Sequence, residues 1–168
     1  NGSDLLHQWG EELRPFGRDC TPRFRVLRHY GTNHDMNEFI LDPERSILLC
    51  RWDVLHTLMP KLPDLAKQSM IVVHDEVHGF GSKSHRLHLD GHFAQVPYNL
   101  GLSATPERAY DNEGNDFLLR NVGPTIYRFG LGDAIESGIL CDFDYYPIEW
   151  EPTQNDRERL RKVYRKQS

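Results

Sequence analysis

Short runs of apolar and β-branched residues recur along the chain, separated by amphipathic stretches. Such runs lie at 24–30, 47–50, 70–73 and 98–102. Runs of this length are typical of buried strands, and strands that alternate with helices build parallel sheets. The pattern therefore predicts an α/β domain with a mainly parallel sheet flanked by helices.

Apolar residues at helical spacing predict the helices between these strands. They recur at 5–13, where Pro15 should end the helix, and at 52–58. A further helix at 131–137 should end at Gly138, because glycine tolerates the left-handed conformation that follows many helices. These positions place a helix before or after most of the predicted strands.

Three other stretches have a different character. Residues 83–92 are polar and rich in histidine, which predicts a loop, whereas 139–150 alternates aromatic and polar residues, which predicts a strand. From Thr153 the chain is highly charged with a narrow apolar stripe, which predicts an exposed helix. Its basic residues could lie along phosphates, but a solvated linker helix is the favoured interpretation; they are Arg157, Arg159, Arg161, Lys162, Arg165 and Lys166.

Length and composition describe an ordinary globular chain. Its 168 residues fit one domain, with 38% hydrophobic and 27% charged residues. The net charge of −5 gives no global basic field, so any contact with nucleic acid must come from local patches. The cysteines Cys20, Cys50 and Cys141 are scattered, which fits a reducing compartment, and no apolar run approaches membrane-spanning length. We therefore expect an intracellular protein without a membrane partner.

The candidate catalytic residues follow the strand predicted at 70–73. Asp75 and Glu76 follow it directly, then His78. Ligands collect at the carboxyl ends of strands in open parallel sheets. One carboxylate there can hold magnesium and the other can orient the water that attacks a γ-phosphate. If the 98–102 strand is the neighbour, the hydroxyls of Ser103 and Thr105 lie beside the acidic pair.

Together these two strand ends resemble a known family. Asp75-Glu76-Val77-His78 and Leu102-Ser103-Ala104-Thr105-Pro106 resemble motifs II and III of superfamily 2 helicases and translocases. The flanks resemble the DEAH-like group that contains XPB/Rad25-type helicases and the ATPase subunits of type I and III restriction systems. Residues 5–13 resemble the helix after motif Ia, and 134–140 resembles the segment that closes the first RecA-like domain. The resemblance covers nearly the whole chain.

The resemblance implies a role for each residue of motif II. Asp75 would coordinate the magnesium of Mg-ATP, through water, and Glu76 would be the general base or water-positioning group. His78 would couple the ATP site to motif III or to a second domain. The cofactors implied are therefore ATP and Mg²⁺.

The remaining implied residues concern coupling and nucleic acid. Ser103, Ala104 and Thr105 would link hydrolysis to the grip on nucleic acid. Arg51 and Trp52 stand where motif Ib would contact the polymer, although the family often has threonine there. The partner implied is nucleic acid, DNA in preference to RNA, along which ATP hydrolysis drives translocation or unwinding.

The resemblance also implies a domain organisation. Residues 1–150 would be part of a first RecA-like domain of the P-loop NTPase type, from motif Ia to motif III. Residues 151–168 would be a linker helix toward a second RecA-like domain. No Gly-x-x-x-x-Gly-Lys-Ser/Thr loop occurs in the sequence, so the domain is expected to be incomplete at its N-terminus and inactive alone.

Two alternatives stay open. The chain could be an ATPase-inactive RecA-like module that binds nucleic acid or a protein. It could also be a metal-dependent hydrolase that uses Asp75, Glu76 and nearby histidines, although His85, His88 and His92 lack an evident supporting partner. For single residues the structural interpretation is favoured: His74 and the tryptophans Trp9 and Trp52 are expected to pack in the core rather than to catalyse or to stack on bases.

Overall fold

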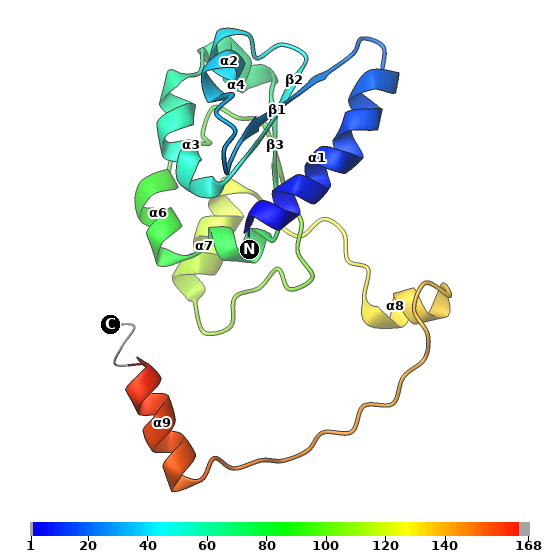
Figure 1. Cartoon of the computed structure of the whole chain (residues 1–168), viewed down its shortest axis with the longest axis vertical. Coiled ribbons are helices and arrows are strands. Elements are labelled where there is room, and N and C mark those ends of the chain that lie inside the picture. Colours follow the sequence, from blue (N-terminus) through cyan, green and yellow to red (C-terminus); the bar gives the residue numbers. More distant parts are fainter. Residues whose placement is uncertain (1, 165–168) are drawn as a thin grey trace. The chain divides into compact units, whose positions relative to one another are not determined.

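The computed structural model describes residues 2–164, which fall into two units, Asn1–Ile126 and Tyr127–Ser168. Figure 1 shows the order of the elements along the chain. The first unit contains all four strands found among the described residues. Its elements are α1 (Gly2–Asp19), β1 (Arg25–His29), α2 (Met36–Leu41), β2 (Ser46–Cys50), α3 (Trp52–Leu58), η1 (Met59–Lys61), α4 (Asp64–Ser69), β3 (Ile71–His74), α5 (Val77–Phe80), α6 (Lys83–Leu89), β4 (Tyr98–Gly101) and α7 (Asn112–Asn121).

The strands form two parallel pairs. β1 pairs with β2, so that His29 lies opposite Cys50, and β3 pairs with β4, so that His74 lies opposite Gly101. The predicted α/β class and parallel pairing are confirmed. The expectation of one sheet is wrong for the described residues, because no backbone ladder joins the two pairs.

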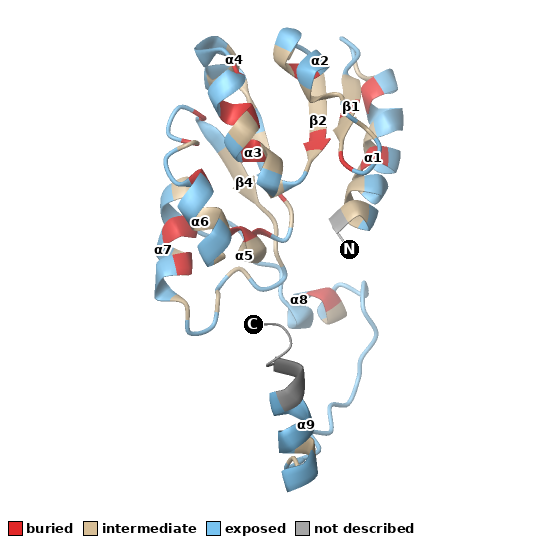
Figure 2. Cartoon of the chain, turned by 60° about the vertical axis from the view of Figure 1, so that its left-hand side comes forward, coloured by how far each residue is buried: buried red, intermediate tan, exposed pale blue. Residues whose placement is uncertain are grey.

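Side chains of one hydrophobic core join the two strand pairs. The core takes residues from β1, from the helices that follow β2 and from those around β3 and β4, and Figure 2 shows them as buried positions on several elements. Phe80 and Phe117 have no exposed surface at all. The core includes Leu27, Phe39, Leu55, Leu58, Met59, Leu62, Val77, Phe80, Leu89, Phe93, Val96, Phe117 and Leu118.

One face of the β3–β4 pair is exposed, contrary to the prediction of a strand buried on both faces. The exposed fractions are 61% for Ile71, 46% for Val73 and 62% for Tyr98. Val72 points to the opposite side and packs against the core, as the twofold side-chain period of a strand requires. The pair is therefore covered on one face within this chain.

Two helices differ from the prediction. α1 continues past Pro15 to Asp19, because a proline inside a helix removes one hydrogen bond without always ending it. Gly17 does not end the helix but allows α1 to approach the backbone of Phe24 closely, since a β-carbon at residue 17 would lie 3.0 Å from the Phe24 carbonyl oxygen. The predicted loop at 83–92 is wrong over most of its length, because Lys83–Leu89 forms α6 and buries Leu89 in the core.

The second unit contains two helices, α8 (Leu131–Glu136) and α9 (Gln154–Tyr164). Gly138 follows α8 with φ +69°, as predicted for a glycine that ends a helix. The side chain of Thr153 accepts a hydrogen bond from the backbone of Asp156 and caps α9. The basic side chains of α9 are exposed at positions 157, 159 and 161, whereas the side chain of residue 162 and residues 165–168 lie outside the described part of the chain.

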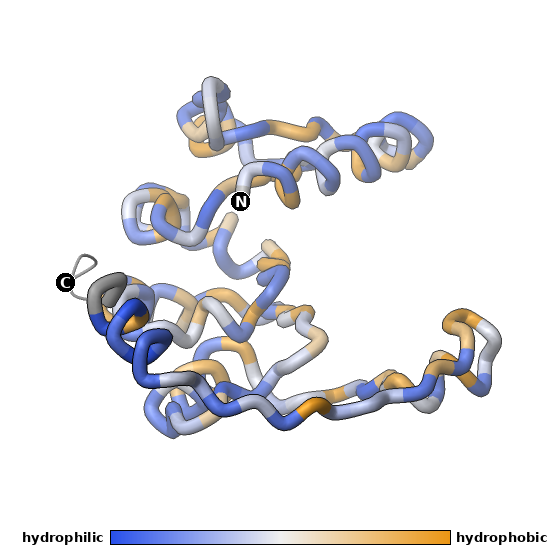
Figure 3. The backbone as a smooth tube through the Cα atoms, turned by 60° about the horizontal axis from the view of Figure 1, so that its bottom comes forward, coloured by the Kyte–Doolittle hydropathy of each residue, from blue (hydrophilic) through white to orange (hydrophobic). Residues whose placement is uncertain are grey.

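Residues 139–150 form no strand, contrary to the prediction. They carry exposed aromatic residues, among them Phe143, Tyr145 and Trp150, and Figure 3 shows apolar and polar positions following one another along this stretch. A strand needs a partner for its backbone ladder, and alternation of side chains does not supply one. Among residues 2–164, no helix has the length and apolar character needed to cross a membrane.

Candidate functional site at the ends of β3 and β4

The acidic strand end and the hydroxyl strand end are neighbours, because β3 pairs with β4, which meets the condition set by the sequence analysis. The backbone ladder continues past the strands: the amide of Leu102 donates to the carbonyl of His74 at 2.9 Å. The amide of Val77 then donates to the carbonyl of Leu102, also at 2.9 Å. These bonds hold the first turn of α5 against the residue that precedes Ser103.

Gly101 makes this approach possible. A β-carbon at that position would lie 2.9 Å from a methyl carbon of Val77. Any larger residue at the end of β4 would push α5 away from the strand end. The sequence therefore builds a close junction between the segments that follow the two strands.

Glu76 has a strained backbone. Its φ of +50° and ψ of +44° lie in the left-handed region, which costs a residue with a side chain about 1–3 kcal/mol. The turn points the Glu76 amide at its neighbour, so that this amide donates to Oδ1 of Asp75 at 2.9 Å. Strain of this kind gathers at functional sites, where the surrounding structure holds the residue in place.

Asp75 accepts a second hydrogen bond on its other oxygen. The indole Nε1 of Trp9, from α1, donates to Oδ2 at 2.6 Å. A carboxylate has about four lone-pair positions, so about half remain open to a metal ion or its waters. The carboxylate is half-buried and fits the role of one magnesium ligand, while the chain shows no phosphate-binding loop beside it.

His78 connects the two strand ends. Its Nδ1 lies 3.1 Å from Oγ of Ser103 and 3.3 Å from Oε2 of Glu76. Oγ of Ser103 also accepts a hydrogen bond from the backbone amide of Thr105 at 3.1 Å. The acidic pair and the Ser103–Thr105 segment therefore form one hydrogen-bonded cluster, in which the Ala104 and Thr105 side chains are exposed.

This cluster does not have the geometry of a nucleophilic triad. In a Ser-His-acid triad the serine and the carboxylate contact different ring nitrogens. One nitrogen takes the proton from serine, and the carboxylate at the other nitrogen stabilises the imidazolium that forms. Here Ser103 and Glu76 both contact Nδ1 of His78. The arrangement suits communication between groups rather than activation of the serine.

His74 lies beneath the acidic turn as a core residue, which confirms its expected packing. It is 1% exposed, its ring stacks on Phe80 with centroids 4.4 Å apart, and Phe93 meets it edge-on. Burial lowers the pKa of His74 to about 4, and the neighbouring Asn99 side chain acts in the opposite direction. The ring is therefore neutral at physiological pH.

Arg51 and Trp52 follow β2, and of the two only Trp52 packs against the helices that follow β3. Trp52 contacts Phe80 and His85 at ring distances of 5.8 and 5.1 Å, and a β-carbon on Gly79 would lie 2.9 Å from its ring. Trp52 is thus a partly buried packing residue, whereas the exposed Arg51 pairs with Asp53 at 2.9 Å. Burial, followed by the charge of Asp53, raises the pKa of the preceding Cys50 to about 12, so its thiol stays protonated.

The histidines weighed as metal ligands in the alternative hydrolase hypothesis do not converge in the described part of the chain. His85 and His88 lie on α6, where His85 is held by Ser82 Oγ at 2.9 Å, and His92 follows the helix. Within residues 2–164 no group of three or more His, Cys, Asp or Glu side chains converges as a metal site.

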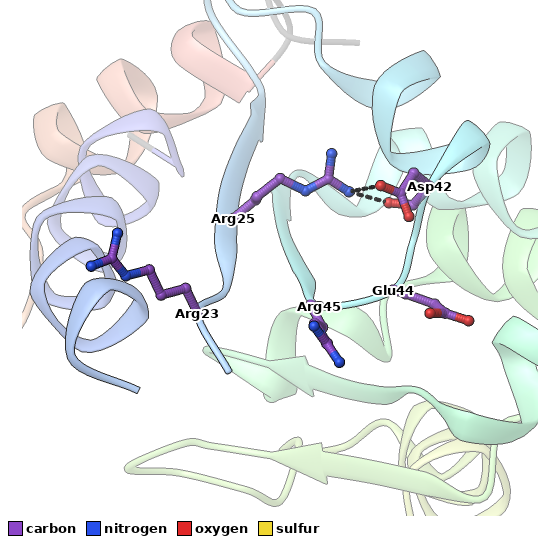
Figure 4. A pocket seen from close by; sticks show the side chains of 5 residues that line it. All are labelled: Arg23, Arg25, Asp42, Glu44 and Arg45. Carbon is purple, nitrogen blue, oxygen red and sulfur yellow. Dashed lines mark hydrogen bonds and ion pairs between the residues drawn. The ribbon is translucent and has the colours of Figure 1, made fainter. Parts of the chain in front are cut away.

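One surface hollow is lined by other residues. A hollow of about 390 Å³ lies at the amino ends of β1 and β2, lined by Arg23, Arg25, Asp42, Glu44 and Arg45. Arg25 is neutralised there by Asp42 at 2.8 Å, and Figure 4 shows the Arg23 side chain pointing away from the other two arginines. The hollow contains none of the predicted site residues.

Two residues of the site were not predicted. Trp9 reaches Asp75 from 66 positions away in the sequence, and Arg108 donates to the carbonyl of His78 from 30 positions away. Neither has a local sequence signal, since both contacts arise from packing of distant segments. No protein-family model, curated protein or solved structure matches the chain.

Proposed function

We propose that this chain is part of the ATPase motor of a nucleic-acid helicase or translocase, built on a RecA-like fold. Asp75 would hold magnesium and Glu76 would position the attacking water, while His78 and Ser103 would communicate the state of the site. The observation that carries the proposal is the position of His78 Nδ1, 3.1 Å from Ser103 and 3.3 Å from Glu76. This contact connects the two sequence segments on which the family resemblance rests.

Two further features support the proposal. The left-handed Glu76 is the kind of backbone strain that functional sites retain. The uncovered face of β3–β4, with Ile71, Val73 and Tyr98 exposed, is the kind of surface that a larger α/β layer buries. A phosphate-binding loop would have to come from outside the 168 residues, since the sequence contains none.

The reaction proposed is hydrolysis of ATP coupled to movement along DNA or RNA, with DNA favoured. Magnesium, when bound, would neutralise charge on the phosphates. Asp75 would provide one oxygen ligand, directly or through water. The second RecA-like domain proposed to follow α9 would contribute the groups that complete the site.

An ATPase-inactive RecA-like binding module is the second candidate. The hydrogen bond from Trp9 to Asp75 favours it, because it occupies one oxygen of the proposed metal ligand. The motor needs this bond to be compatible with magnesium binding, whereas a binding module can keep it permanently.

ATP hydrolysis separates the two candidates. The 168-residue chain alone is expected to hydrolyse no ATP above background. The longer protein that carries this chain with a phosphate-binding loop is expected to hydrolyse ATP, faster when single- or double-stranded DNA is added. Binding of DNA without any ATP hydrolysis would favour the inactive module, and turnover by the chain alone that Glu76→Gln abolishes would contradict the proposed division of the site.

A further inference from the structure

Two partly buried arginines bind carbonyls of α5 and its C-terminal turn: Arg108 comes from the segment that follows Ser103, and Arg86 comes from α6. Nη1 of Arg108 donates to the carbonyl of His78 at 2.5 Å, and Nη1 of Arg86 donates to the carbonyl of Gly81 at 2.9 Å. Both carbonyls belong to α5 and its C-terminal turn. Helix ends leave such carbonyls without partners inside the helix, so each guanidinium satisfies a group that the short helix cannot.

Asp111 holds both arginines. Its Oδ2 accepts from Nε of Arg108 at 2.8 Å, and its Oδ1 lies 3.3 Å from Nη1 of Arg86. It also caps α7 by accepting from the amide of Gly114 at 2.9 Å. The hydrogen bond from Arg108, followed by the bond from Gly114, lowers the pKa of Asp111, which keeps it ionised between the two cations.

The remaining groups of the cluster fit around this arrangement. The Asn115 side chain binds both the amide and the carbonyl of Arg108, at 2.9 and 3.0 Å. A β-carbon at Gly114 would lie 2.6 Å from Asp111, and one at Gly81 would lie 2.8 Å from the Arg108 side chain. The cluster therefore depends on glycine at two positions in separate segments, as well as on its charged members.

The consequence concerns His78, whose ring and carbonyl are both held by the segment that follows β4. Its ring contacts Ser103, and its carbonyl is bound by Arg108, five residues further along the same segment. These two contacts tie α5 to the 103–108 segment. We propose that Arg108, fixed by Asp111, is a positioning residue that holds the His78 ring in hydrogen-bonding contact with Ser103.

This inference rests on the proposed function, which assigns His78 and Ser103 a coupling role, but its first test does not depend on ATP. The test records imidazole ¹⁵N chemical shifts of the chain labelled at histidine, because these shifts report the tautomer and hydrogen bonding of each ring nitrogen. Ser103→Ala identifies the His78 signal and defines the shift that follows loss of the contact. Arg108→Met is expected to move the same signal in the same direction, by at least half that amount.

Arg120→Met is the matched control. Arg120 lies on α7 and, like Arg108, faces an aspartate, Asp90 at 3.8 Å, but it makes no hydrogen bond or ion pair with α5. It is expected to leave the His78 signal at its wild-type position. If Arg108→Met destabilises the fold, Arg108→Lys at low temperature provides the same comparison, since lysine keeps the charge but not the two-pronged contact.

A His78 signal unchanged in both Arg108 variants, with Ser103→Ala clearly shifted, would overturn the inference. The longer ATP-hydrolysing protein provides a second readout. Since Arg108 contacts neither Asp75 nor Glu76, Arg108→Met should lower kcat for ATP about tenfold and leave KM within about twofold. A kcat equal to wild type would also overturn it, whereas a protein without ATPase activity in any variant would contradict the proposed function and leave the ¹⁵N result decisive for Arg108.

Discussion

The two strand pairs have the same geometry and different surroundings. Both are parallel, and in each the first strand ends in a histidine, His29 in β1 and His74 in β3. After β1 the chain continues with Tyr30, which is 4% exposed and donates from its hydroxyl to the carbonyl of Leu6. After β3 it continues with the half-buried Asp75 and the exposed Glu76. Parallel pairing thus brings the ends of two strands together in both cases. The residues just after the strands determine whether that edge packs into the fold, as after β1, or presents polar side chains that could bind a ligand, as after β3.

The faces of the two pairs differ as well. No residue of β1 or β2 is exposed, and both strands are contacted by α1 and α2. β3 and β4 leave one apolar face open. The pair that carries the candidate chemistry is therefore the one whose packing is incomplete within this chain.

The largest effect is expected directly beneath the acidic turn. Phe80→Ala removes a ring that is 0% exposed and stacked on His74, so the free energy of unfolding should fall by about 3–5 kcal/mol. Chemical denaturation monitored by far-UV circular dichroism measures this. Phe143→Ala, at a position 55% exposed, is the control and should change it by less than about 0.5 kcal/mol. Equal effects would contradict the packing described.

Acid should destabilise the β3–β4 side through His74. Burial lowers the pKa of His74 to about 4, below its ordinary value of 6.5, so the folded state binds this proton less readily than the unfolded chain. The stabilisation is full above pH 6.5 and is lost as the pH falls toward 4, by up to about 3 kcal/mol. His74→Leu should remove one proton from the pH dependence of unfolding between these values. If the free energy of unfolding of His74→Leu depends on pH as it does in the wild type, the acid destabilisation comes from groups other than His74.

The Trp9–Asp75 hydrogen bond should contribute less. Trp9→Phe removes the indole donor to a carboxylate, and we expect a loss of about 1–2 kcal/mol. Trp150→Phe, at a position 68% exposed, makes the same chemical change and should have no measurable effect on unfolding. If magnesium competes with Trp9 for Asp75, Trp9→Phe should also bind Mg²⁺ more tightly than the wild-type chain in a calorimetric titration.

The smallest effects test the uncovered face. Val73→Thr should cost less than about 0.5 kcal/mol, because Val73 is 46% exposed, whereas Val72→Thr buries a hydroxyl against the core and should cost about 1–2 kcal/mol. Thermal unfolding of the two variants gives the comparison. Equal costs at both positions would show that the face of Val73 is covered in solution.

Local patterns predicted the four strands and most helices, because side-chain periodicity is a local property. They also identified the polar residues at two strand ends, but pairing of these strands was only a condition. The predictions failed where contacts with distant segments determine the structure. The strand expected at 139–150 has no partner among the described residues, and α6 forms at a histidine-rich stretch where Leu89 is buried in the core. Trp9 and Arg108 could not be assigned, since their roles depend on contacts made across the fold.

The central claim is that Glu76, in its left-handed turn after β3, positions water for ATP hydrolysis. The most direct test compares Glu76→Gln with Glu44→Gln, an exposed control just before β2, in the proposed longer protein that would carry this chain with a phosphate-binding loop. The account predicts that Glu76→Gln lowers kcat by at least about 100-fold while ATP affinity stays within about threefold, and that Glu44→Gln leaves both unchanged. Full turnover by Glu76→Gln would contradict it.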